Sequence, residues 1–139
     1  MLISKICIIA GGILSLFMVL FHIRFYKLFN WKKDFEKIST INRKVFYTIH
    51  LALLLLFLAF SFISFAYTTE LSQCNGVAGG ITLGYSLFWL WRTIWQIVYF
   101  RPPRSQKTGK MIFMHYLLII VIGILFVVYL VPFIFKFKL

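Results

Sequence analysis

Four long runs of apolar residues divide the chain, and shorter polar connections separate them. The runs cover residues 6–25, 45–67, 77–100 and 111–135, and each reaches the length of about 20 residues that a helix needs to cross a hydrocarbon core. None has the alternating pattern of a transmembrane β-strand. Because a bilayer offers no water to the backbone, such runs form helices. The pattern predicts an all-α, polytopic membrane protein: one domain, residues 1–139, folded as a four-transmembrane-helix bundle.

Basic residues predict the orientation of this bundle. The connection at residues 26–44, flanked by Arg24, and the connection at 101–110 are rich in Lys and Arg, whereas the connection at 68–76 has neither. Basic loops face the cytoplasm. We therefore expect cytoplasmic loops at 26–44 and 101–110, with both termini outside, in the cytoplasmic (inner) membrane of a bacterium.

Composition excludes some classes of function. A net charge of +12 is typical of nucleic-acid binding, but here the charges lie between apolar runs, and we expect no nucleic-acid partner. In the first basic connection, aromatic residues alternate with lysines, which predicts an interfacial segment that binds anionic inner-leaflet lipid. The two cysteines, Cys7 and Cys74, are too few for a cysteine metal site, and whether they form a disulfide stays open.

The third run carries polar residues within an apolar sequence. Arg92 and Gln96 are one helical turn apart, and the same face continues through Tyr85, Trp89 and Tyr99. An ionisable residue inside a span costs about 2.5–3.5 kcal/mol, so it usually faces the protein interior. On the outer part of this run, Gly76, Gly80 and Gly84 have the spacing that lets another helix approach, and residues 11–12 are the expected contact.

Each of the four runs places a polar side chain near its cytoplasmic end. His22, His50 and His115 lie on the first, second and fourth runs, at a depth similar to that of Arg92 and Gln96 on the third. We expect a shared site in which the three histidines ligate haem b or a transition-metal ion. Arg92 would bind propionates or another anion, and Gln96 and Tyr99 would orient ligands. A purely structural polar cluster is the competing interpretation.

The chain resembles a family of uncharacterised small bacterial four-helix membrane proteins. The residues that carry the resemblance are Phe21-His22, Trp31 with Asp34-Phe35, Asn42 with Phe46-Tyr47 and His50, residues 88–92 with Gln96 and Tyr99-Phe100, and His115. That resemblance spans nearly the whole chain and implies no activity. Size, helix count and His and Arg content are also similar to the haem-binding membrane protoporphyrinogen oxidases and to the copper-resistance D family.

Three functional hypotheses follow. The first is binding of haem b or a metal ion for a membrane redox step, with enzymatic activity left open. The second is a non-catalytic accessory or scaffold subunit, which needs a membrane protein partner or a homo-oligomer. The third is a small oligomeric transporter with Arg92 as its anion site.

Overall fold

The computed structural model describes residues 2–100 and 109–136, and within these ranges the chain is helical and contains no strand. This confirms the predicted all-α class. The predicted basic loop at 101–110 and the C-terminal Lys138 lie largely outside the described residues. The helices are α1 (Leu2–Ile23), α2 (Phe25–Leu28), α3 (Trp31–Phe35), α4 (Thr40–Ala66), α5 (Thr68–Gln73), α6 (Gly76–Val98) and α7 (Gly109–Lys136).

In the described part of the chain, three helices are long and apolar enough to cross a membrane: Leu2–Ile23, Thr40–Ala66 and Met111–Lys136. The chain is therefore a multi-pass membrane protein by length and composition. The third predicted span, which α6 covers, is not among them. Its sequence contains glycine, hydroxyl and tryptophan residues as well as Arg92 and Gln96, and these lower its hydropathy.

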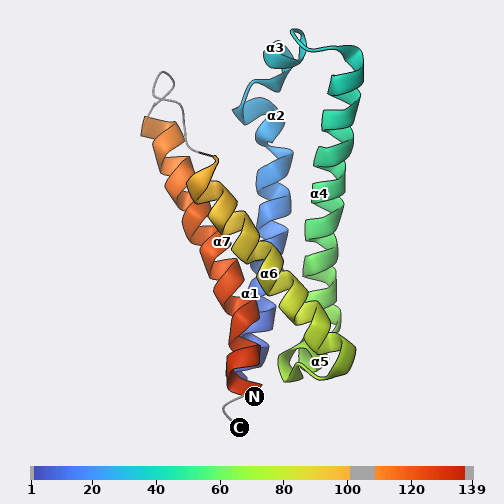
Figure 1. Ribbon diagram of the computed structural model, residues 1–139, viewed down its shortest axis with the longest axis vertical. Coiled ribbons are helices and arrows are strands. Elements are labelled where there is room, and N and C mark those ends of the chain that lie inside the picture. Colours follow the sequence, from blue (N-terminus) through green and yellow to red (C-terminus); the bar gives the residue numbers. More distant parts are fainter. Residues whose placement is uncertain (1, 101–108, 137–139) are drawn as a thin grey trace.

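The four long helices form a bundle that is closed at one end and splayed at the other (Figure 1). α1 begins, and α7 ends, at the end that carries α5, which we call the α5 end. The short helices α2 and α3 lie at the opposite end, which we call the α3 end. α6 runs diagonally from the α5 end to the α3 end, so it diverges from α4 while it stays beside α7.

Tyr129 joins three helices near the α5 end. Its hydroxyl lies 2.8 Å from Ser64 Oγ on α4 and 3.5 Å from Ser15 Oγ on α1. All three side chains are fully buried. Gly11 makes room for the phenol ring, because a Cβ atom there would lie 2.6 Å from Tyr129 Cζ. This packing, in which a small residue admits a neighbouring ring, holds α1, α4 and α7 together.

The predicted packing of the glycines on the third run against residues 11–12 was wrong. A Cβ atom at Gly80 or Gly84 would meet nothing within 4 Å, so neither glycine receives a neighbouring helix within the described chain. The close approach is made instead at Gly79, where a Cβ would collide with the backbone carbonyl of Cys74. The reason is that α5 folds back against the first turns of α6, and only the face with Gly79 meets it.

A hydrogen bond between the turn at Cys74 and α7 also stabilises the α5 end. Cys74 adopts a positive φ of 52°, and its carbonyl accepts a 2.6 Å hydrogen bond from Lys136 Nζ at the end of α7. Cys7 and Cys74 are both free thiols.

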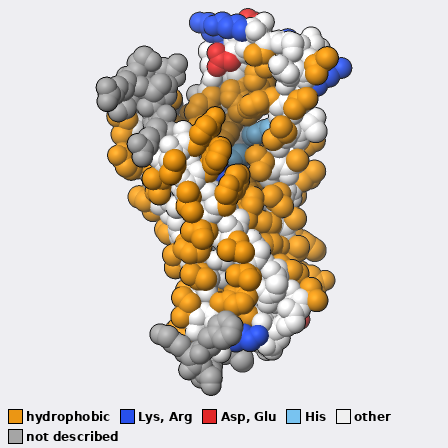
Figure 2. All heavy atoms as spheres, viewed as in Figure 1, with side chains coloured by type: hydrophobic (Ala, Val, Ile, Leu, Met, Phe, Trp, Pro, Cys, Tyr) orange, Lys and Arg blue, Asp and Glu red, His pale blue; other side chains and the backbone are white. Residues whose placement is uncertain are grey.

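Aromatic rings join α4 and α6 at mid-height. Phe60 stacks on Tyr85 with ring centroids 3.9 Å apart, and Phe57 stacks on Trp89 at 5.2 Å. We call these four rings the aromatic layer. Large apolar side chains remain exposed along the outside of the bundle, as the orange surface in Figure 2 shows. Such a surface is the kind that lipid covers.

Candidate ligand-binding cavity

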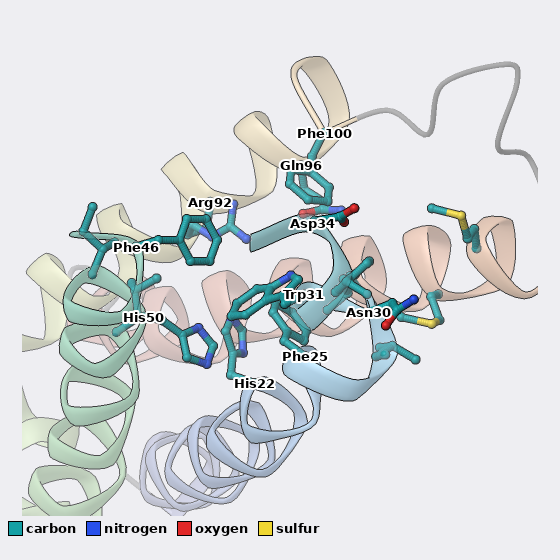
Figure 3. A pocket seen from close by; sticks show the side chains of 17 residues that line it. His22, Phe25, Asn30, Trp31, Asp34, Phe46, His50, Arg92, Gln96 and Phe100 are labelled. Carbon is teal, nitrogen blue, oxygen red and sulfur yellow. The ribbon is translucent and has the colours of Figure 1, made fainter. Parts of the chain in front are cut away.

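A cavity of about 780 Å³ opens above the aromatic layer, between the splayed ends of α4 and α6 (Figure 3). Its walls are mostly aromatic and aliphatic, with a few polar groups. They comprise His22, Phe25, Leu28, Phe29, Asn30, Trp31, Asp34, Phe46, Ile49, His50, Leu53, Arg92, Gln96, Phe100, Met111, Met114 and Leu118. This combination of volume, apolar wall and few convergent polar groups is typical of a small-molecule site.

The helices α2 and α3 roof the cavity because the chain turns sharply between them. Asn30 adopts a left-handed conformation with φ 51°, which asparagine tolerates better than most residues. The turn brings Trp31 against α4, where its ring lies 4.7 Å from that of Phe46 and 4.9 Å from that of His50. Ser39 then caps α4 by accepting a hydrogen bond from the backbone N–H of Asn42.

The two histidines of α1 and α4 share one wall of the cavity. Their ring centroids are 6.1 Å apart, and the ring of Phe25 stacks on His22 at 4.3 Å. His22 Nδ1 lies 2.9 Å from the carbonyl oxygen of Met18. A carbonyl only accepts, so Nδ1 carries the proton and neutral His22 keeps its lone pair on Nε2.

Arg92 is the cation of the cavity. Figure 3 shows its side chain projecting from α6 toward α3, the short helix that carries Asp34. Within residues 2–100 and 109–136, no carboxylate forms an ion pair with Arg92, and its guanidinium makes no hydrogen bond. Asp34 lines the same cavity from the roof. The cavity therefore contains one positive and one negative side chain that do not neutralise each other by direct contact.

Gln96 lines the cavity one turn beyond Arg92 and is only 1% exposed. Its Nε2 lies 3.3 Å from Nδ1 of His115 on α7. His115 itself does not line the cavity, so the structure places it behind Gln96 rather than beside His22 and His50.

The predicted site is thus assembled only in part. His22, His50, Arg92 and Gln96 share the cavity, whereas His115 contacts it through Gln96. Tyr99 is the C-cap residue of α6; it is 69% exposed, stacks on Trp95 and does not line the cavity. In the described part of the chain, no three His, Cys, Asp or Glu side chains are grouped to hold a metal ion. The expected three-histidine metal centre is not formed.

Some lining residues were not expected from the sequence. Asp34, Phe25 and Met114 line the cavity, and none stood out as a ligand-contacting position. The available signal was the alternation of aromatic residues and lysines between Arg24 and Lys44, which indicated an interfacial segment but not a roof. Comparison with family models, with curated proteins and with solved structures finds no match to this chain.

Proposed function

We propose that α6 is a fourth span and that the protein is a four-helix transmembrane bundle. The chain path supports this. α4 ends at the α5 end, α7 begins at the α3 end, and α6 is the segment that connects them (Figure 1). If α4 and α7 both cross the bilayer, α6 crosses it too. Its 23 residues, at about 1.5 Å each, are long enough.

The proposed orientation places the α3 end in the cytoplasm and both termini outside, in a bacterial inner membrane. Seven basic residues support it, since Arg24, Lys27, Lys32, Lys33, Lys37, Arg43 and Lys44 all lie between the end of α1 and the first turns of α4. The test is a pair of C-terminal reporter fusions. Alkaline phosphatase should be active and a fluorescent protein dark; the reverse pattern overturns this orientation.

The cavity's proposed function is to bind an amphipathic ligand through an acidic group. Arg92 carries the proposal: its guanidinium faces the cavity without an ion-pair partner among the described residues, and the walls around it are largely apolar. A cation inside a membrane usually pairs with an opposite charge or with backbone carbonyls. A guanidinium binds carboxylate or phosphate through two parallel hydrogen bonds. The aromatic walls then suit the apolar body of the same ligand.

The experiment compares lipid and small molecules retained by the purified protein with those retained by two Arg92 variants. Arg92→Gln should lose the acidic ligand by at least about tenfold, the size of a charge-assisted hydrogen-bonded pair, and Arg92→Lys should retain part of it. Arg24→Gln is the matched control, because it removes an equal charge outside the cavity lining. Equal retention by all three variants contradicts the proposal.

Haem b is a second candidate ligand, favoured by one specific observation. His22 donates its Nδ1 proton to a backbone carbonyl, which is the arrangement that fixes the tautomer and ring orientation of metal-ligating histidines. The porphyrin supplies four nitrogen ligands itself, so one or two imidazoles suffice where a bare ion would need more protein ligands. His22 and His50 would hold the iron, and Arg92 would bind a propionate.

An absorption spectrum of protein purified from its own host, together with metal analysis, tests this candidate. A Soret band that His22→Ala and His50→Ala each weaken, and that His115→Ala leaves at its position, supports haem ligation in the cavity. A colourless, iron-free protein would exclude haem as the ligand. The retention experiment would then decide whether the cavity binds a colourless acidic ligand.

A further inference from the structure

The cavity opens sideways rather than toward the end of the bundle. α4 and α6 touch through the aromatic layer, and toward the α3 end they diverge (Figure 1). Figure 2 looks at the bundle from the side, and the histidines, coloured pale blue, are visible at the bottom of a hollow between apolar surfaces. The roof of α2 and α3 covers the other direction. In a bilayer such an opening faces lipid.

Next to Arg92 in the sequence, α6 carries a ladder of exposed rings. Trp91 stacks on Trp95 at 5.8 Å, and Trp95 stacks on Tyr99 at 4.5 Å. The ladder begins at Phe88, whose ring contacts Phe57 and Phe60 of α4 where the two helices start to diverge. From Phe88 toward the α3 end, these rings form an apolar surface along α6, which suits contact with an entering lipid.

The polar part of the cavity contains one basic and one acidic side chain. Arg92 lies on α6, and Asp34 lies on α3 beside Trp31, whose indole contacts Phe25 and Phe46. A ligand with an acidic group alone satisfies Arg92 but brings a second negative charge toward Asp34. A ligand with an acidic and a cationic group satisfies both, and the aromatic rings add cation–π attraction for the cation.

We infer that the ligand is an aminophospholipid of the inner leaflet, bound with its phosphate on Arg92 and its primary ammonium on Asp34 and Trp31. The lipid moves in sideways between α4 and α6 past the Trp91–Tyr99 ladder, and its chains leave the cavity near Phe88 and point toward the α5 end. This inference rests on the proposed function, since it names the head group that the Arg92 site takes. It is a binding proposal and includes no covalent step.

The test uses delipidated protein in neutral detergent, and native mass spectrometry counts the lipid bound at equal concentrations. The probes are phosphatidylethanolamine and phosphatidylglycerol with identical chains, and inorganic phosphate alone. Phosphatidylethanolamine should bind about two- to fivefold more tightly than phosphatidylglycerol, the range of one partly exposed ion pair. Inorganic phosphate at the same concentration should not displace it, because the chain contributes to binding.

Two carboxylate variants make the head-group assignment specific. Asp34→Asn should abolish the preference for phosphatidylethanolamine and leave phosphatidylglycerol binding unchanged or stronger. Glu36→Gln, which removes the next acid along the chain and does not line the cavity, should keep the preference. Circular dichroism and size-exclusion profiles identical to those of the parent protein show that both variants are folded.

The outcomes separate this inference from the proposed function. Equal binding of both lipids, insensitive to Asp34→Asn but lost with Arg92→Gln, overturns the aminophospholipid and keeps the acidic-group site. If inorganic phosphate alone displaces the bound lipid, the site recognises free phosphate and the lipid assignment is overturned. Binding of either lipid that is insensitive to Arg92→Gln overturns both proposals.

Discussion

Gln96 Nε2 lies 3.3 Å from His115 Nδ1, which joins α6 to α7 directly behind the cavity wall. With this assignment of the amide, the Nδ1 of His115 accepts and the second amide hydrogen and the carbonyl oxygen of Gln96 remain available to a ligand. If the cavity binds the proposed ligand, His115 is a positioning residue, because it contributes to binding through the orientation of the Gln96 amide.

We expect His115→Phe to weaken binding of the acidic ligand about two- to tenfold, which corresponds to the loss of one net hydrogen bond. The ring volume is retained, but the Gln96 amide loses the partner that orients it. His115→Asn should restore most of the affinity, since an asparagine side chain can accept the same hydrogen bond. Equilibrium binding of the lipid probe measures all three proteins.

The double variant Gln96→Ala with His115→Phe is the control for that prediction. If His115 acts through Gln96, the double variant binds no more weakly than Gln96→Ala alone. Additive losses would show that His115 contacts the ligand by another route.

Tyr129→Phe should destabilise the bundle by about 0.6–1.5 kcal/mol. The variant removes the hydroxyl that lies 2.8 Å from Ser64 Oγ; Ser64 keeps its 2.7 Å hydrogen bond to the Phe60 carbonyl, whereas the buried Ser15 hydroxyl loses its acceptor at 3.5 Å. Thermal or denaturant unfolding in detergent measures the effect. Ligand binding should be unchanged, because Tyr129 lies at the α5 end.

Two neighbouring glycines should respond in opposite ways to the same substitution. Gly79→Ala places a Cβ against the Cys74 carbonyl, whose backbone is fixed by the Lys136 hydrogen bond. Its cost belongs to the range of about 1–3 kcal/mol found for overpacking. Gly80→Ala meets nothing within 4 Å and removes a flexible residue from a helix, so it should be neutral or stabilising. Melting temperatures compare the two.

A loss of oligomer in Gly80→Ala, with an unchanged monomer stability, would identify the open glycine face as a subunit contact. Equal destabilisation by both variants would contradict the packing described for α5 and α6.

Cys74 should react slowly with alkylating reagents. Burial raises the pKa of the Cys74 thiol, and the hydrogen bond with Thr82 and the charge of Lys136 oppose that shift only in part. A raised pKa leaves less thiolate at a given pH, so alkylation should be slower than for a free thiol and should increase with pH beyond the ordinary value of about 8.5. The rate is measured in a Cys7→Ala background.

The alkylation rate of Cys74 is compared before and after denaturation in strong detergent. Denaturation should restore the rate of an ordinary exposed thiol. The sign for stability follows from the same shift. The folded protein holds the thiol proton more tightly than the unfolded chain does, so this contribution is fully present below the ordinary pKa and is lost as pH rises from there through the raised pKa of the folded protein. A Cys74 rate equal to that of a free thiol at every pH would contradict the burial.

The helices were the most predictable part of this protein. The expected runs at 6–25, 45–67, 77–100 and 111–135 correspond to α1, α4, α6 and α7, because a bilayer forces long apolar segments into helices. Their ends differ by a few residues, since polar caps such as Ser39 extend α4 beyond its apolar core. That α6 crosses the membrane stays a prediction.

The site was less predictable because depth along a helix does not fix rotation about its axis. His22, His50 and Arg92 share both depth and direction, whereas His115 shares only depth and faces α6. Tyr99 caps the C-terminus of α6 and is exposed. Asp34 and Trp31 enter the cavity through a left-handed turn at Asn30, and a single such residue in a basic loop gives no periodic signal.

The aromatic layer between α4 and α6 has a mechanical consequence. The rings of Phe57, Phe60, Tyr85 and Trp89 join α4 and α6 between the cavity on one side and the hydroxyl network of Tyr129 on the other. If the proposed ligand enters between α4 and α6, we expect the two helices to separate only on the cavity side of this layer. The α5 end, which the Tyr129 network holds together, would then keep its packing.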